Sequence, residues 1–242
     1  MDDTLELNEQ LVEFKSDIAH NPDDDGAYND MGIVYGKLGE YDQAIQCFRK
    51  ALSINPKLAE AYSNMGFAYA FLQDYDHAIE CYLQALKLDQ KCVETFCNTG
   101  AAYMEIEDYH RAFYYFKRAR KLDPNNADIC NNIGNAYAYM NQLGRAIKWF
   151  EKAIDLDPEC ISAYENLGQA YDIRNDGEKA RYYYQQAADL GSEDAQKWLN
   201  ENKYRRFIPL TIYTEMGRAI YILKFNALEY KDGKKKIIFS II

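Results

Sequence analysis

Four asparagines recur at one fixed interval along the chain and could act together as hydrogen-bonding groups. They are Asn64, Asn98, Asn132 and Asn166, each 34 residues from the next, and Asp30 stands one interval before them. A primary amide both donates and accepts, so a regular row of amides can hydrogen-bond the backbone of an extended peptide whatever its side chains. The four amides are therefore candidate hydrogen-bonding groups for a ligand. The alternative is that these asparagines only order or solvate the local fold.

Other residue types that often carry chemistry lack the required spacing. The six cysteines form no CxxC pair and the chain has only three histidines, whereas zinc sites need closely spaced Cys or His ligands. No phosphate-binding glycine loop, HExxH motif or Ser or Cys nucleophile elbow is present. We therefore expect no catalytic residue, no metal site and no cofactor. The cysteines are expected as free thiols, buried or half-exposed.

Composition and charge narrow the class of protein. Apolar residues make up 48% of the 242 residues and aromatic residues 14%, enough for a sizeable core, and the net charge is −10. This charge disfavours nucleic acid as a partner and favours a neutral or basic one. No run of 18 apolar residues exists, so no membrane-spanning helix is expected. Residues 1–10 are acidic and lack the features of a secretory signal, which predicts a cytoplasmic protein.

The 34-residue interval extends well beyond the asparagines. Five blocks align without gaps: 25–58, 59–92, 93–126, 127–160 and 161–194. Position 8 of every block is glycine, position 11 is tyrosine, positions 20 and 27 are alanine, and position 24 is Phe or Tyr. A period in this range is typical of repeat architectures, in which each unit packs on the next.

Each block has the pattern of two antiparallel helices. Turn residues such as Leu38-Gly39 and Glu107-Asp108 separate the two, and Asn55-Pro56 ends a second helix. A glycine inside a helix is tolerated where a neighbouring backbone needs the room, and the rings are expected to fill the space between hairpins. We therefore predict an all-α solenoid of about 11 to 12 helices. Residues 1–24 are expected to form an N-terminal capping helix and residues 193–206 a C-terminal one.

These columns resemble the tetratricopeptide repeat family over residues 25–192. The match comprises Tyr or Trp, Leu, Gly, Tyr, Ala, Phe, Ala and Pro at positions 4, 7, 8, 11, 20, 24, 27 and 32, with departures at Gln90, Ser192, Cys130 and Thr99. The resemblance implies a right-handed superhelix whose first helices line a concave groove, with ligands contacting positions 2, 5, 6, 9, 12 and 13. The asparagine column resembles the one in the repeat superhelix of O-linked N-acetylglucosamine transferase.

Carried onto this chain, the family's groove positions give a set of candidate ligand contacts. Besides the four asparagines, the set contains Asn131, Asn135, Phe67, Phe71, Met104, Tyr139, Glu60, Glu94 and Asp128. The groove positions hold seven acidic residues against the single base Lys37. They lack the Lys or Arg that family members use to clamp the carboxylate tails of heat-shock chaperones. The expected ligand is an extended, neutral-to-basic peptide with one or two apolar anchors. Packing between repeats is the alternative role of the apolar residues.

The C-terminal segment, residues 207–242, does not follow the repeat. Residues 205–242 carry eight basic and three acidic side chains, a net charge of +5 that leaves −15 for residues 1–204. Apolar runs around Lys231-Asp232-Gly233-Lys234 favour strands and a β-hairpin; a helix over 214–230 is the alternative. Three roles stay open: binding in the acidic groove of the same or a neighbouring copy, hence self-association; a sticky surface hairpin; and an incidental extension.

These patterns together predict a protein-interaction scaffold or adaptor rather than an enzyme. Two other functions remain open. One is an accessory role in assembly, secretion, pilus formation or polysaccharide export through the convex face or the tail. The other is a regulatory fragment of a repeat-containing enzyme such as a glycosyltransferase.

Overall fold

The computed structural model describes residues 2–202, 210–213, 220–231 and 234–241, with side chains for residues 4–202. Within this part of the chain there are twelve α-helices, which confirms the predicted all-α repeat fold. Their bounds are α1 Asp2–His20, α2 Asp25–Lys37, α3 Tyr41–Ile54, α4 Ala59–Phe71, α5 Tyr75–Leu88, α6 Val93–Glu105, α7 Tyr109–Leu122, α8 Ala127–Tyr139, α9 Leu143–Leu156, α10 Ile161–Ile173, α11 Gly177–Asp189 and α12 Glu193–Glu201.

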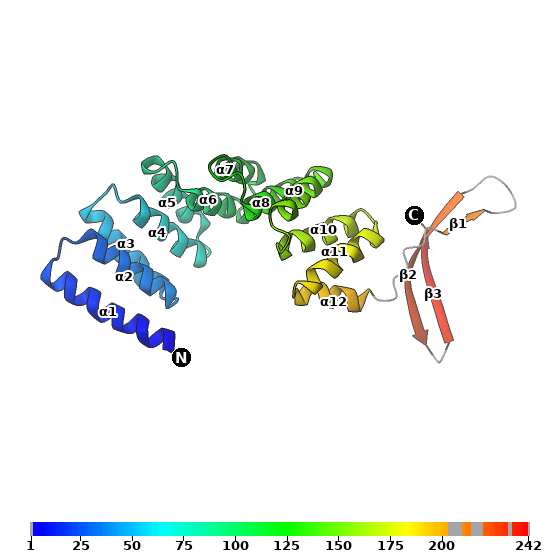
Figure 1. Ribbon diagram of the computed structural model, residues 1–242, viewed down its shortest axis with the longest axis horizontal. Helices are drawn as coiled ribbons and strands as arrows, with labels where there is room; N and C mark the ends of the chain where they lie inside the picture. The colour runs from blue at the N-terminus through cyan, green and yellow to red at the C-terminus, as the bar shows by residue number, and fades with distance from the viewer. Residues whose placement is uncertain (1, 203–209, 214–219, 232–233, 242) are drawn as a thin grey trace. The chain divides into compact units, whose positions relative to one another are not determined.

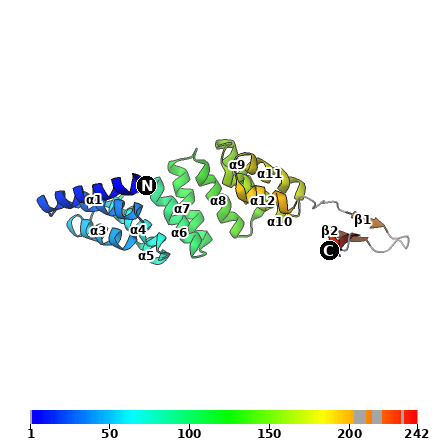
Figure 2. The same ribbon diagram turned by 90° about the horizontal axis from the view of Figure 1, so that it is seen from below.

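The chain divides into two compact units, Met1–Asn141 and Gln142–Ile242. In the first unit, α2 packs on α3, α4 on α5 and α6 on α7, and each pair also packs on the next helix along the chain. Figure 1 shows these pairs as antiparallel neighbours in chain order, and Figure 2 shows the same succession from a second side. In the second unit α10 packs between α9 and α11, and α12 packs on α11.

A large ring lies over the recurring glycine at Gly32, Gly66, Gly100 and Gly168. A Cβ added to Gly100 would lie 2.5 Å from an edge carbon of Phe116, and one added to Gly66 would lie 2.8 Å from the ring of Tyr82. The expected close neighbour of the glycine was a backbone. At these glycines the nearest atoms belong to the position-24 ring of the same hairpin, and at Gly66 the backbone oxygen of Ala78 also lies 3.0 Å from the added Cβ. The ring thus packs on the glycine of its own hairpin, and at Phe48 it also belongs to a buried cluster with Met65 and Ala68 of the next hairpin, so it fills space between hairpins as expected.

The alanine columns mark the closest packing in the core. Their side chains are fully or almost fully buried, as at Ala44, Ala78, Ala112 and Ala146, each with 0% exposure. Small side chains let two helices approach closely while the neighbouring rings fill the remaining space. The alanine columns thus lie in the core of both units.

Tight turns join the two helices of each hairpin. Position 15 of every block has a left-handed backbone: Gly39 (φ 78°), Gln73 (60°), Glu107 (61°), Asn141 (58°) and Asn175 (59°). The amide after it reaches back over the end of the first helix, as in the 2.9 Å bond from Asp108 N to Tyr103 O. Asp74, Asp108 and Asp176 then cap the second helix by accepting from the backbone amide three residues ahead.

All six cysteines carry free thiols: Cys47, Cys81, Cys130 and Cys160 are buried, and Cys92 and Cys97 are half-buried. Burial raises the pKa of the Cys47 and Cys81 thiols to about 11. The cysteines thus behave as small core residues.

Three strands follow the helices: β1 Leu210–Tyr213, β2 Ile220–Lys231 and β3 Lys234–Ile241. They form an antiparallel sheet in the order β1-β2-β3. Leu210 is opposite Leu223, Lys231 is opposite Lys234, and the register shifts between Phe225 and Ala227. The turn expected at Asp232-Gly233 lies outside the described residues. Among the described residues, no helix is both long and apolar enough to cross a membrane.

Candidate functional site

The asparagines of the 34-residue column occupy equivalent places on successive first helices. Asn64 lies on α4, Asn98 on α6 and Asn132 on α8, and all three side chains are half-buried. Nδ2 of Asn64 donates to Oδ1 of Asn29 on α2 at 3.2 Å. Asn29 is only 3% exposed and was not among the predicted residues. The first amide of the column therefore uses its donor to tie two repeats together.

The next two amides differ from Asn64 in this respect. Across the described part of the chain, the side chains of Asn98 and Asn132 form no hydrogen bond. A half-buried amide without a partner is costly unless water or a ligand satisfies it. Both side chains border hollows in the first unit, so their donors and acceptors are accessible to a ligand.

The first hollow, of about 280 Å³, lies between α2, α4 and α6. Asn64 and Asn98 line it together with Phe67, Phe71 and Glu94, so it joins five of the predicted contacts. Phe67 and Phe71 are 46% and 54% exposed. Their ring centroids are 4.7 Å apart, and Phe71 also stacks on Tyr41 of α3 at 4.9 Å. The hollow thus combines amides, one carboxylate, one ammonium group at Lys37 and an exposed aromatic surface.

The second hollow, of about 370 Å³, lies between α6, α7 and α8. Four predicted contacts line it: Asn132, Asn135, Met104 and Tyr139. Tyr139 is 64% exposed, and its ring stacks on Tyr109 of α7 at 5.2 Å. The lining also includes two acidic residues, Glu105 and Glu107, and no basic one, so this hollow is acidic.

A tyrosine at position 17 of three consecutive repeats supports the edge of these hollows. Tyr41 contacts Phe71 and Tyr109 contacts Tyr139, in each case at position 13 of the following repeat. Tyr75 instead forms a hydrogen bond with Glu105, which is also at position 13 of the following repeat. Burial and this carboxylate raise the pKa of the Tyr75 phenol. Sequence reasoning missed these tyrosines, although their own 34-residue spacing was a usable signal. The exposed rings therefore both pack between repeats and face solvent.

The remaining predicted contacts line neither hollow. Asn131 is only 6% exposed, so it belongs to the packed interior and leaves the candidate set. Glu60 and Asp128 are exposed on α4 and α8 and add negative charge near the first helices. Asn166 is half-buried on α10 in the second unit. Among the described residues no group of three His, Cys, Asp or Glu side chains could hold a metal ion.

Family models match most of the repeat region. Models described as tetratricopeptide repeat match residues 23–91 and 93–126, one described as TPR repeat matches 134–172, and a Sel1 repeat model matches 161–192. No curated protein sequence matches the chain.

Solved structures with the same fold cover most of the chain. The structure of YrrB, a TPR protein with an unusual peptide-binding site, has a TM-score of 0.63 and 23% identity, over 78% of this chain and 97% of YrrB. MamA has a TM-score of 0.62 and 27% identity, over 69% and 97% of the two chains. PilF of Pseudomonas aeruginosa has a TM-score of 0.64 and 24% identity, over 74% and 86%.

Proposed function

This chain belongs to the tetratricopeptide repeat family, and on that premise we propose that it is a protein-interaction scaffold whose first helices bind an extended peptide of a partner protein. The observation that carries the proposal is the pair of amides at Asn98 and Asn132, which have no hydrogen-bond partner in the described residues and border two hollows. Each amide offers a donor and an acceptor to the ligand's main chain.

The lining of the hollows specifies the chemistry of the ligand. Phe67, Phe71 and Tyr139 are large exposed rings, and such rings are costly in water unless a partner covers them. An apolar side chain of the peptide would insert against these rings. Glu105 and Glu107 in the second hollow then favour a neutral or basic peptide over an acidic one, while Lys37 and Glu94 offset each other in the first. The ligand we propose is an extended segment with one or two apolar anchors and a neutral-to-positive charge.

Two further aspects belong to the same proposal. The protein acts by binding alone, without a catalytic centre or a cofactor, as repeat scaffolds of this family generally do. It works in the cytoplasm, where a reducing environment suits its six free thiols. The peptide-binding site named for YrrB gives the proposal a precedent on the same fold.

The test compares peptide binding by the wild type and by a double variant, Asn98→Ala with Asn132→Ala. A peptide is first selected from a displayed random library on the wild-type protein, and its affinity is then measured by fluorescence polarisation. Each lost hydrogen bond is worth about 1 kcal/mol, so the double variant should bind on the order of tenfold or more weakly. Asn125→Ala, at an exposed asparagine before α8, is the matched control and should leave the affinity unchanged.

Two results would contradict the proposal. One is equal affinity for the wild type and the double variant, because the amides would then make no contact with the ligand. The other is selection of acidic peptides without apolar anchors, since neither the rings nor the carboxylates would recognise them. Circular dichroism melting of each variant shows whether a loss of binding comes from unfolding.

A further inference from the structure

The helix α7 is unusual in its charge. It carries five basic residues and no acidic one: Arg111, Lys117, Arg118, Arg120 and Lys121. Each of the other eleven helices has at least one Asp or Glu, and the whole chain has a net charge of −10. A cationic helix in an anionic protein creates a local positive field that differs in sign from that of the groove. This field favours an anionic ligand on α7.

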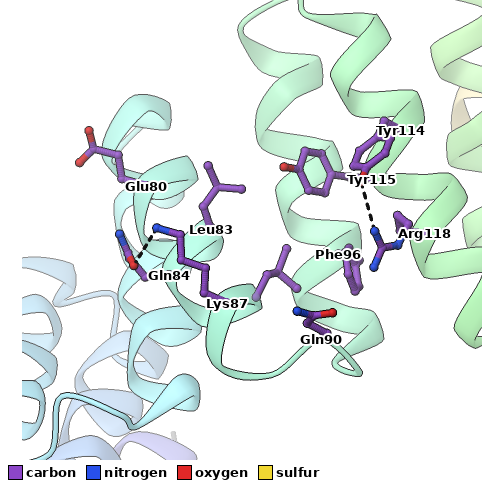
Figure 3. A pocket seen from close by; sticks show the side chains of 10 residues that line it. Glu80, Leu83, Gln84, Lys87, Gln90, Phe96, Tyr114, Tyr115 and Arg118 are labelled. Carbon is purple, nitrogen blue, oxygen red and sulfur yellow. Dashed lines mark hydrogen bonds between the residues drawn. The ribbon is translucent and has the colours of Figure 1, made fainter.

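A hollow of about 630 Å³ lies beside α7, between it and α5 of the preceding hairpin (Figure 3). Its apolar lining includes Leu83 from α5, Phe96 from α6 and Tyr115 from α7. Lys87 on α5 and Arg118 on α7 supply its two cations, and Glu80 is its single acidic residue. The second helices make up most of this hollow, so it is separate from the two hollows lined by the asparagines.

The two cations are positioned but not neutralised. The guanidinium of Arg118 lies 5.2 Å from the centroid of the Phe96 ring and donates to the Tyr114 hydroxyl at 3.1 Å. Nζ of Lys87 donates to Oε1 of Gln84 at 3.2 Å. In the part of the chain with described side chains, neither cation forms an ion pair, whereas Arg111 on the same helix is paired with Asp108. The guanidinium of Arg118 therefore keeps N–H groups that can donate hydrogen bonds to a carboxylate.

We propose that this hollow is a second binding site, which takes an acidic peptide segment of a partner protein. One carboxylate of the peptide pairs with Arg118 and another with Lys87, while an apolar side chain packs on Leu83, Phe96 and Tyr115. Figure 3 shows the two cations on different helices at the two sides of this apolar lining. A peptide fits better than a nucleic acid, because a long polyanion would also meet Glu80 and the negative field of the rest of the molecule.

This site goes beyond the proposed function, since it would let one chain hold two ligands of opposite charge on different faces. A basic segment would bind along the first helices, and an acidic segment would bind between the second helices α5 and α7. The two sites share no side chain, as the hollows have no lining residue in common. Failure of one proposal therefore leaves the other standing.

The experiment titrates the full chain with a fluorescein-labelled peptide of sequence DEFDE and measures polarisation at low and physiological salt. Arg118→Gln and Lys87→Gln should each weaken binding on the order of tenfold, the loss expected for one charge-assisted hydrogen bond. Lys117→Gln removes the same charge from an exposed position of α7 that does not line the hollow, and should change affinity less than twofold. Arg118→Lys should restore part of the affinity, which a purely structural role would not predict.

Control ligands and a control variant test whether binding depends on the charge of the peptide and on this hollow alone. The uncharged peptide NQFNQ should not bind, and the variant with Asn98→Ala and Asn132→Ala should bind DEFDE as the wild type does. The proposal is overturned if DEFDE does not bind, if Lys117→Gln weakens it as much as Arg118→Gln, or if a ten-nucleotide oligo-dT binds more tightly with the same variant pattern. It is also overturned if Arg118→Gln reduces the oligomer size in light scattering, since the occupant would then be a second copy of the chain.

Discussion

At the scale of single residues, the glycine at position 8 is required by the ring above it. A Cβ at position 100 would lie 2.5, 2.7 and 2.9 Å from three atoms of the Phe116 ring, which is only 2% exposed and cannot move away freely. We expect Gly100→Ala to lower the free energy of unfolding by about 1–3 kcal/mol, the usual cost of overpacking a core. Urea denaturation followed by circular dichroism measures this change.

Gly36 provides the matched control for Gly100. It also lies inside a first helix, α2, but an added Cβ would meet no atom within 4 Å. Gly36→Ala should therefore raise stability by about 0.5–1 kcal/mol, because alanine has the higher helix propensity. A stabilising effect of both substitutions would show that the Phe116 ring does not constrain position 100.

The contacts of these glycines and asparagines could be predicted from the sequence only in part. Invariant spacing was enough to predict that each glycine makes room for a neighbour, but not that the neighbour is a ring of its own hairpin. Likewise, Asn64 and Asn98 are equivalent in the sequence, yet of these two only Asn64 has a partner among the described residues, because α2 supplies Asn29 whereas α4 has Ser63 at the equivalent position. Periodicity assigns a residue to a column, whereas its contacts depend on the particular side chains of adjacent repeats.

At the scale of secondary-structure elements, the aspartate before a second helix has a pH-dependent role. At the start of α7, Asp108 accepts a hydrogen bond from the backbone amide of Arg111 and pairs with its guanidinium. The backbone bond comes first among the interactions that lower the pKa of Asp108. A carboxylate with a lowered pKa in the folded state stabilises the protein above its unfolded pKa, near 4, and loses this effect as the pH falls through the folded pKa.

We therefore expect Asp108→Asn, which keeps a capping oxygen but no charge, to weaken the pH dependence of stability in acid. The stability difference between wild type and variant should be largest near pH 7 and should shrink as the pH falls below the unfolded pKa and through the lowered folded pKa of Asp108. Thermal unfolding from pH 7 to pH 2.5 measures it. Glu40→Gln is the control, since Glu40 precedes α3 at the equivalent position without a side-chain cap bond. Parallel curves for wild type and Asp108→Asn would exclude this role.

The backbone of the turns follows only partly from the residue types, whereas the polar character of α1 follows from the sequence. Gly39, Asn141 and Asn175 are residues that favour a left-handed backbone, but Gln73 and Glu107 adopt it as well. The hairpin geometry, rather than residue preference, imposes that conformation on them. In α1, Gln10 and Asp17 stand one period before the buried Ala44 and Ala51. Helix α1 thus has polar side chains where the other second helices bury alanine against a first helix, as the sequence led us to expect for the end of an array.

At the scale of the whole molecule, the repeat period was sufficient to predict the solenoid, because each hairpin buries its core only against its neighbours. The repeat columns do not predict the hollow between α5 and α7. This hollow depends on a cluster of cations that belongs to one repeat rather than to a shared column. The division into two units and the three-stranded sheet are likewise properties that no repeat column contains.

The charge asymmetry of the chain leads to a prediction at the same scale. Residues 205–242 have a net charge of +5 against −15 for residues 1–204, and a tethered segment competes at an effective concentration in the millimolar range. Even a weak attraction between the basic segment and the acidic hollow lined by Asn132 would therefore reduce binding of a free basic peptide. Replacing Lys234, Lys235 and Lys236 with Gln in the full chain should raise the affinity for the library-selected peptide severalfold at low salt.

Ionic strength distinguishes this electrostatic competition from other causes. The Debye length shortens from about 10 Å at 0.1 M salt to about 3 Å at 1 M, so the gain in affinity should disappear as salt is added. Light scattering of the same variant reports whether the competing segment belongs to the same copy or to another one: a smaller species indicates another copy. Unchanged affinity and unchanged size at every salt concentration would mean that these lysines, and the charge of the segment with them, play no part in controlling access to the groove.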